Sequence, residues 1–193
     1  MNQRFHRIAA ICGLLAPTLT LTLIFISIKL SPWFSWQDSA LSDMGVSATS
    51  NVFNATLFMG GALQLIFVLG GLRSTIGPGQ MARWGLGAVL IGAIALPLIG
   101  VFTEAYGRTH YYIAATYFLA TPLGYSLIGG ALIRRGDRVT GWLSIAAGLT
   151  ALLAITLVPH TGIAVPEILA ATIMGAWTFS ISVKLLVENS PHE

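Results

Sequence analysis

The sequence predicts an all-α, polytopic membrane protein, a bundle of six transmembrane helices that forms a single domain over residues 1–193. Three observations predict this fold class. Of the 193 residues, 55% are hydrophobic and only 9% are charged, whereas a soluble domain carries about 25% charged residues. Six stretches are apolar over about 20 residues, the length of helix that crosses a bilayer. The basic residues stand mostly at the ends of these stretches.

The six apolar stretches place the expected helices along the chain. We expect spans over residues 8–28, 52–72, 84–102, 111–133, 140–158 and 165–186. The first stretch is longer than the apolar region of a signal peptide and is followed by no small-residue cleavage site, so it is expected to be retained. Pro17, Pro97 and Pro122 fall inside spans, which transmembrane helices tolerate because neighbouring groups satisfy the freed backbone.

The distribution of basic residues predicts the orientation. With the N-terminus in the cytoplasm, only Lys29 and Arg108 lie outside, and the other eight of the 10 Lys and Arg residues lie inside. This bias satisfies the positive-inside rule and places both termini in the cytoplasm of a protein of the plasma (cell) membrane. The pI of about 9.4 therefore reflects topology and contacts to membrane lipid, and no nucleic-acid partner is expected.

Polar residues gather in the loops on the predicted outer side. The first outer loop, about residues 29–51, is long and contains a turn at 41–45 (LSDMG). The second and third outer loops add further carboxylates and both histidines that lie away from the termini. The residues that share this side are Asp38, Asp43, Glu104, His110, His160 and Glu167.

Two chemical hypotheses follow from this outer cluster. Asp43, His110 and His160 are candidate ligands for zinc, or for calcium if carboxylates predominate. Alternatively, Ser42, Asp43, Glu104 and His110 are candidate catalytic residues for acid–base or nucleophilic chemistry. The sequence contains neither HExxH nor GxSxG, so no catalytic spacing supports either hypothesis.

A structural interpretation stays open beside the chemical ones. Glu167 follows Pro166 at a helix start, where a carboxylate favours the positive end of the helix dipole. Asp43 then serves only the turn, and Glu104 pairs with Arg108 at the surface. Asn54, Gln64 and Glu167 are the candidate ligand-binding residues, and Gln64, deep in the second span, is expected to bond a neighbouring helix.

The outer-loop residues carry a family resemblance. Residues 41–45 (LSDMG), 52–54 (VFN) and 102–104 (FTE), followed by His110, resemble an uncharacterised prokaryotic family of six-helix membrane proteins, domain of unknown function nine-nine-eight. The family is distantly similar to DRAM-like membrane proteins. The resemblance runs along most of the chain and implies that Ser42, Asp43, Gly45, Asn54, Glu104 and His110 are its signature positions. Met44 stands where the family has leucine or isoleucine.

Three functions compete at this point. The first is a membrane protein that binds a lipid, another hydrophobic ligand or a membrane partner. The second is a metal-assisted or acid–base hydrolase that acts on lipid at the outer face of the membrane. The third is a small-solute transporter, which the absence of Asp, Glu, Lys and Arg from the middle of the spans disfavours. The sequence specifies neither the reaction nor the oligomeric state.

Overall fold

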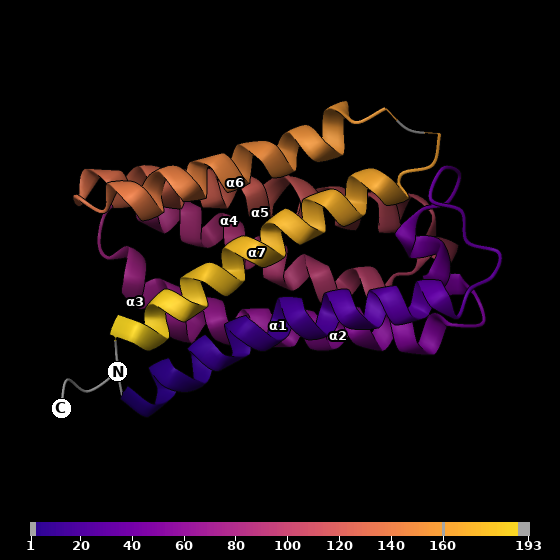
Figure 1. Ribbon diagram of the computed structural model, residues 1–193, viewed down its shortest axis with the longest axis horizontal. Coiled ribbons are helices and arrows are strands. Elements are labelled where there is room, and N and C mark those ends of the chain that lie inside the picture. Colours follow the sequence, from indigo (N-terminus) through magenta and orange to yellow (C-terminus); the bar gives the residue numbers. More distant parts are fainter. Residues whose placement is uncertain (1–2, 160, 189–193) are drawn as a thin grey trace.

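The computed structural model describes residues 3–159 and 161–188, which are mostly helical and contain no β-strand. Six long helical segments run side by side, as expected (Figure 1). Their ends differ from the predicted ones by at most five residues. The segments are α1 (Gln3–Lys29), α2 (Ser50–Phe67) continued by a π-helical turn η2 (Val68–Leu72) and α3 (Arg73–Ile76), α4 (Gln80–Val101), α5 (Arg108–Arg134), α6 (Arg138–Leu157) and α7 (Ala164–Glu188).

The helices form a closed ring. Each long helix packs on its neighbours in the sequence, and α7 returns to pack on α1. The connections at one end are short, whereas the other end carries the long loop between α1 and α2 (Figure 1). That loop contains a short 3₁₀ helix, η1 (Leu41–Val46), and the α4–α5 connection contains a second one, η3 (Glu104–Tyr106). We call this end of the bundle the η1 end.

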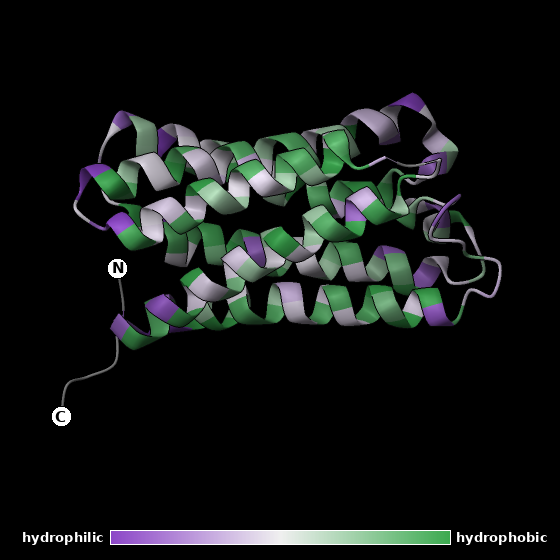
Figure 2. Cartoon of the chain, turned by 45° about the horizontal axis from the view of Figure 1, so that its top comes forward, coloured by the Kyte–Doolittle hydropathy of each residue, from purple (hydrophilic) through white to green (hydrophobic). Residues whose placement is uncertain are grey.

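The outer surface of the ring is apolar, which is the reverse of a soluble protein. Each of the six segments is long and hydrophobic enough to cross a membrane, and hydrophilic residues concentrate at the two ends of the bundle (Figure 2). Tyr111 is 67% exposed at the η1 end, and Trp142 is 62% exposed near the opposite end. Such amphipathic rings favour the two membrane–water interfaces. The fold is therefore that of a multi-pass membrane protein.

Glycines set the distance between α4 and α5. A Cβ added to Gly85 would lie 3.0 Å from the carbonyl oxygen of Gly124, and one added to Gly124 would lie 2.9 Å from the carbonyl oxygen of Gly85. Backbones that approach this closely gain packing energy that larger residues would prevent, which is how helices associate in lipid. The same close approach joins Gly129 of α5 to Gly141 of α6.

A buried group of polar and aromatic side chains joins α5, α6 and α7 in the middle of the bundle. The rings of Tyr125 and Trp177 stack with centroids 3.7 Å apart. Trp177 Nε1 donates to Ser144 Oγ over 2.8 Å, and the hydroxyls of Tyr125 and Thr178 lie 3.0 Å apart. These bonds satisfy groups that would otherwise be unpaired in an apolar medium, and they fix α7 against α5 and α6.

An ion pair fixes α7 at the end opposite to η1. Asp137 begins α6 and accepts from Thr140 N, and Lys184 of α7 bonds both Asp137 and Thr140 Oγ1. Partial burial alone would raise the pKa of Asp137, but the hydrogen bonds from Lys184 and Thr140 outweigh it and hold the pKa below its ordinary value.

The glycine contacts give a paired prediction. Gly85→Ala should lower the free energy of unfolding by about 1–3 kcal/mol, because its Cβ would press on the backbone of α5. Gly87→Ala is the matched control, since no atom lies within 4 Å of a Cβ at that position. Alanine favours a helix over glycine by about 1 kcal/mol, so this variant should be at least as stable as the wild type. Thermal unfolding in detergent measures both, and equal midpoints for the two variants would contradict the packing described.

Candidate functional site

The loop between α1 and α2 covers the η1 end of the bundle and is anchored at two places. Its two ends meet through the hydroxyls of Ser31 and Thr49, which lie 3.1 Å apart. In its middle, the carbonyl of Ser39 accepts from Ala164 N at the start of α7 over 2.9 Å. These anchors hold η1 directly over the interior of the ring.

Two carboxylates organise the start of η1. Asp43 Oδ2 accepts from Ala40 N over 2.8 Å, which is the turn role that the sequence predicts for it. Glu167 Oε2 accepts from Leu41 N over 2.8 Å, although 126 positions separate the two residues in the sequence. Glu167 is 7% exposed, so it does more than face its own helix dipole: it holds the loop to α7.

Ser42 and Asn54 connect η1 to two further helices. Ser42 Oγ donates to Glu104 Oε1 over 2.7 Å, which reaches η3, and Asn54 Nδ2 of α2 donates to the carbonyl of Gly45 over 2.9 Å. A Cβ at Gly45 would lie 2.8 Å from Asn54 Oδ1, so a larger residue there would displace the Asn54 side chain. Ser42, Gly45, Asn54 and Glu104 therefore form one hydrogen-bonded unit.

His110 lies in the first turn of α5 and is 7% exposed. Its Nδ1 lies 2.7 Å from the carbonyl oxygen of Phe102. Because a carbonyl can only accept, Nδ1 must carry the hydrogen, and Nε2 is left to accept or to be protonated. Among the described residues Nε2 has no hydrogen-bond partner, and the ring borders both hollows described below.

Burial and neighbouring charge control the ionisation of Glu104. Burial is the largest cause and raises its pKa, and the adjacent Asp43 carboxylate raises it further. The hydrogen bond from Ser42 and the charge of His110 act in the opposite direction without cancelling the rise. Arg108 does not neutralise Glu104 as the surface-pair interpretation expects: its guanidinium donates to Tyr112 Oη over 3.0 Å and lies over that ring.

The structure groups most of the predicted site residues at one place. Ser42, Asp43, Glu104, His110 and Glu167 meet at the η1 end, and Asn54 lies beside them. His160 lies outside the described residues, so the zinc or calcium site with Asp43, His110 and His160 stays a prediction. Within residues 3–159 and 161–188 no group of three or more His, Cys, Asp and Glu side chains could hold a metal ion.

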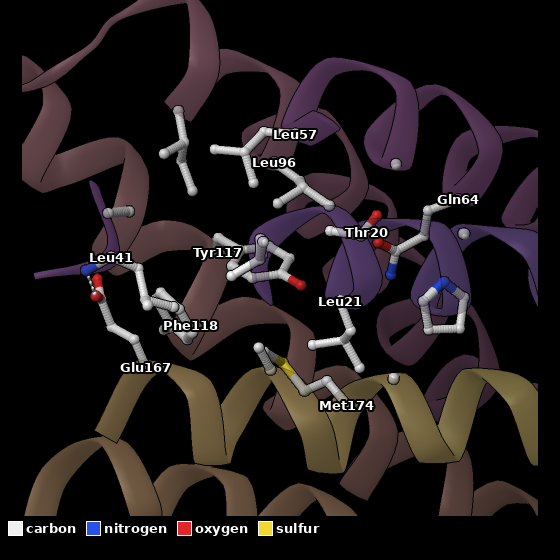
Figure 3. Close-up of a pocket in the computed structure, with 18 of the residues that line it drawn as sticks. Thr20, Leu21, Leu41, Leu57, Gln64, Leu96, Tyr117, Phe118, Glu167 and Met174 are labelled. Carbon is white, nitrogen blue, oxygen red and sulfur yellow. Dashed lines mark hydrogen bonds between the residues drawn. The ribbon is translucent and has the colours of Figure 1, made fainter. Parts of the chain in front are cut away.

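A narrow hollow, which we call the central cavity, runs from this cluster into the middle of the ring. It has a volume of about 80 Å³. Ser42, His110 and Glu167 border the part of it that lies nearest the η1 end. The walls are apolar and come from α1, α2, α4, α5 and α7, with Leu57, Leu96 and Tyr117 among them (Figure 3).

Gln64 lies at the far end of the central cavity from Glu167 (Figure 3). It is 6% exposed, but its side-chain amide makes no hydrogen bond to any described residue, contrary to the expected bond to a neighbouring helix. Thr20 Oγ1, beside it in Figure 3, is also buried without a partner. The amide of Gln64 therefore faces the cavity.

A second and wider hollow, the side crevice, lies between α5, α6 and the start of α7 and has a volume of about 570 Å³. It shares Ser42, His110 and Glu167 with the central cavity. Its rim includes the exposed Tyr111 and Leu119 on the outer surface of α5. The polar cluster thus stands where the two hollows meet.

Several residues of the site were not singled out by the sequence. Thr20, Tyr117, Phe118 and Thr178 all line the central cavity. They are apolar, aromatic or hydroxyl side chains in spans rich in the same types, so no local signal separates a cavity wall from ordinary packing. Only the ring arrangement brings them to one hollow.

The fold and the site define a multi-pass integral membrane protein with a buried carboxylate–histidine cluster above a hydrophobic cavity. Residues 14–184 match the family model described as "Protein of unknown function (DUF998)". The match covers most of the chain, so the chain belongs to this family, as its outer-loop residues indicate. No curated protein and no solved structure matches the chain.

The raised pKa of Glu104 predicts a pH dependence of stability. The folded state favours its protonated form, so its contribution to stability is present below the ordinary glutamate pKa and is lost as the pH rises through the folded value. Glu104→Gln cannot ionise and still offers an oxygen to Ser42. Its unfolding midpoint in detergent should therefore exceed that of the wild type at about pH 8, by a few degrees, and match it at about pH 4.

Ser42→Ala provides the opposite case. It removes the hydrogen bond that favours the ionised carboxylate, so its loss of stability should be larger at about pH 8 than at about pH 4. A gain for Glu104→Gln that is the same at both pH values would show that ionisation of Glu104 does not govern the effect.

Proposed function

We propose that this protein binds a single-chain amphiphile of the membrane, with the polar head group at the carboxylate–histidine cluster and the chain in the central cavity. The observation that carries the proposal is the continuity between the two parts. The carboxylate–histidine cluster stands at one end of a hollow whose walls are mostly apolar, with Thr20 and Gln64 towards its other end. A mostly apolar lining with a few placed polar groups is usual for a ligand site.

The length of the central cavity supports a lipid chain. Glu167 and Thr178 both border it and stand eleven positions apart on α7, a distance of about 16 Å at a rise of 1.5 Å per residue. Phe53 and Gln64 give the same span on α2. The hydrocarbon core of a bilayer is about 30 Å thick, so the cavity extends about as far as the chains of one leaflet. Its small volume favours one chain over a fused ring system.

The side crevice supports entry from the bilayer. Its rim lies on the exposed surface of α5 beside Tyr111 and Leu119, at the level where head groups meet hydrocarbon chains. An amphiphile that enters there keeps its head near the interface while its chain passes inward below the cluster. Such a path avoids exposing the chain to water.

The bias of basic residues supports an orientation in the plasma membrane with both termini in the cytoplasm and η1 outside. Single cysteines in a Cys12→Ala background test this topology. A membrane-impermeant thiol reagent applied to intact cells should label Gln37→Cys, which is exposed in the α1–α2 loop. Gln80→Cys, exposed at the opposite end, should react only after permeabilisation. The reverse labelling pattern would show that both termini and the η1 end lie on the sides of the membrane opposite to those proposed.

Filling the junction of the two hollows should remove the bound amphiphile. Ala114 borders both hollows, so Ala114→Phe should reduce the lipid that copurifies in mild detergent by at least about tenfold, since a phenyl ring occupies the space that the chain needs. Ala146→Phe makes the same change on the exposed surface of α6 and should retain the lipid at the wild-type ratio. Native mass spectrometry of the purified proteins measures this ratio.

The same spectra separate binding from hydrolysis. Ser42 Oγ donates to the Glu104 carboxylate, an arrangement in which a carboxylate could accept the proton of a hydroxyl nucleophile. An intact lipid bound to the wild type supports a binding protein, whereas cleaved products that become intact lipid in Ser42→Ala would favour the hydrolase. Equal lipid content in Ala114→Phe and the wild type, with both folded, would contradict the proposed site.

A further inference from the structure

The described ionisable side chains at the junction of the two hollows include three carboxylates and no lysine or arginine. Asp43, Glu104 and Glu167 act on one another electrostatically, and Glu104 and Glu167 border the side crevice itself. No lysine or arginine of the described chain lines either hollow. Arg108, four positions after Glu104 in the sequence, donates a hydrogen bond to Tyr112 at the surface instead.

The described hydrogen bonds do not use all the acceptors. Glu167 accepts from Leu41 N through Oε2, and Glu104 accepts from Ser42 through Oε1. In each case this bond occupies one carboxylate oxygen, so further lone pairs remain. A ligand that brings hydrogen-bond donors would find acceptors already in position.

One buried side chain points to a ligand independently of the carboxylates. His110 is 7% exposed and borders both hollows. Its Nε2 has no hydrogen-bond partner among the described residues. Buried polar groups are rarely left unpaired in proteins, so a molecule at the junction of the hollows is expected to supply its partner.

Carboxylates favour one head-group chemistry over others. An anionic head, such as a phosphate or a carboxylate, would meet like charges in a partly desolvated place, where repulsion is weakly screened. A protonated amine offers three donors and a positive charge. Charge-assisted hydrogen bonds of this kind are stronger than bonds between neutral groups.

We infer that the ligand is a cationic amphiphile, with a protonated amine bound at Glu104, Glu167 and His110 and a single apolar chain in the central cavity. The inference rests on the proposed function and adds the chemical class of the head group. A bound ammonium favours the ionised form of nearby carboxylates, so in this arrangement Glu104 and Glu167 balance its charge. In the neutral form of His110, Nε2 accepts from one of the ammonium N–H groups.

Three amphiphiles of equal chain length test the head group: dodecylamine, dodecanol and dodecanoate. Each is titrated into the detergent-purified protein at about pH 7, where the amine is protonated and the acid ionised. The apparent Kd follows from the ligand-dependent rise of the unfolding midpoint. Dodecylamine should bind at least about tenfold more tightly than dodecanol, the ratio that one charge-assisted hydrogen bond contributes, and dodecanoate should bind more weakly than either.

A variant with both Glu104→Gln and Glu167→Gln tests the proposed partners of the amine. Glutamine keeps an acceptor oxygen for Ser42 and for Leu41 N, so the cluster can still assemble. The preference for amine over alcohol should fall by about tenfold or more, while the affinity for dodecanol stays close to that of the wild type. Asp38→Asn is the matched control, because that carboxylate lies at the same end but borders neither hollow, and it should keep the preference.

The outcomes distinguish the two proposals. Dodecanoate or dodecanol binding as tightly as dodecylamine, or a double variant that keeps the amine preference, would overturn the cationic head group and leave amphiphile binding in place. If none of the three compounds stabilises the wild type more than it stabilises Ala114→Phe, amphiphile binding itself fails, and the head-group inference fails with it.

Discussion

The bond from the Leu41 amide to the Glu167 carboxylate determines where the long loop lies. It adds to the other anchors of the loop and joins η1 to α7 beside the place where Ser42 reaches Glu104. The bond costs the desolvation of a carboxylate, and it is favourable because an amide that begins a helix has no partner of its own. Both hollows meet beside this bond, so it positions the site as well as the loop.

The membrane fold could be predicted from the sequence because its cause is local. An apolar stretch of about 20 residues has one stable form in lipid, and each such stretch in this chain became a helix. Shared position in the bundle could be expected for a similar reason, since loops on one side of a membrane lie at one end of the bundle. Ser42, Asp43, Glu104, His110 and Glu167 do meet there.

The partners of these residues could not be predicted in the same way. Glu167 bonds an amide from a distant loop, and Gln64 faces a cavity although helix contact was expected. Both outcomes depend on how the ring closes, which is set by the glycine contacts between α4, α5 and α6 and by the return of α7 to α1. Hydropathy carries no information about such contacts, because lipid and a packed helix face are equally apolar.

The closure of the ring by α7 has a consequence for biosynthesis. A chain is inserted from its N-terminus, so α1 through α6 enter the membrane before the helix that completes the wall. Until α7 packs on α1, the interior of the ring is open to the bilayer on that side, and Leu41 N has no carboxylate to bond. The loop, the cluster and the cavity therefore acquire their final form together, in the last step of assembly. Only a chain that has been translated through α7 can complete the wall of the cavity.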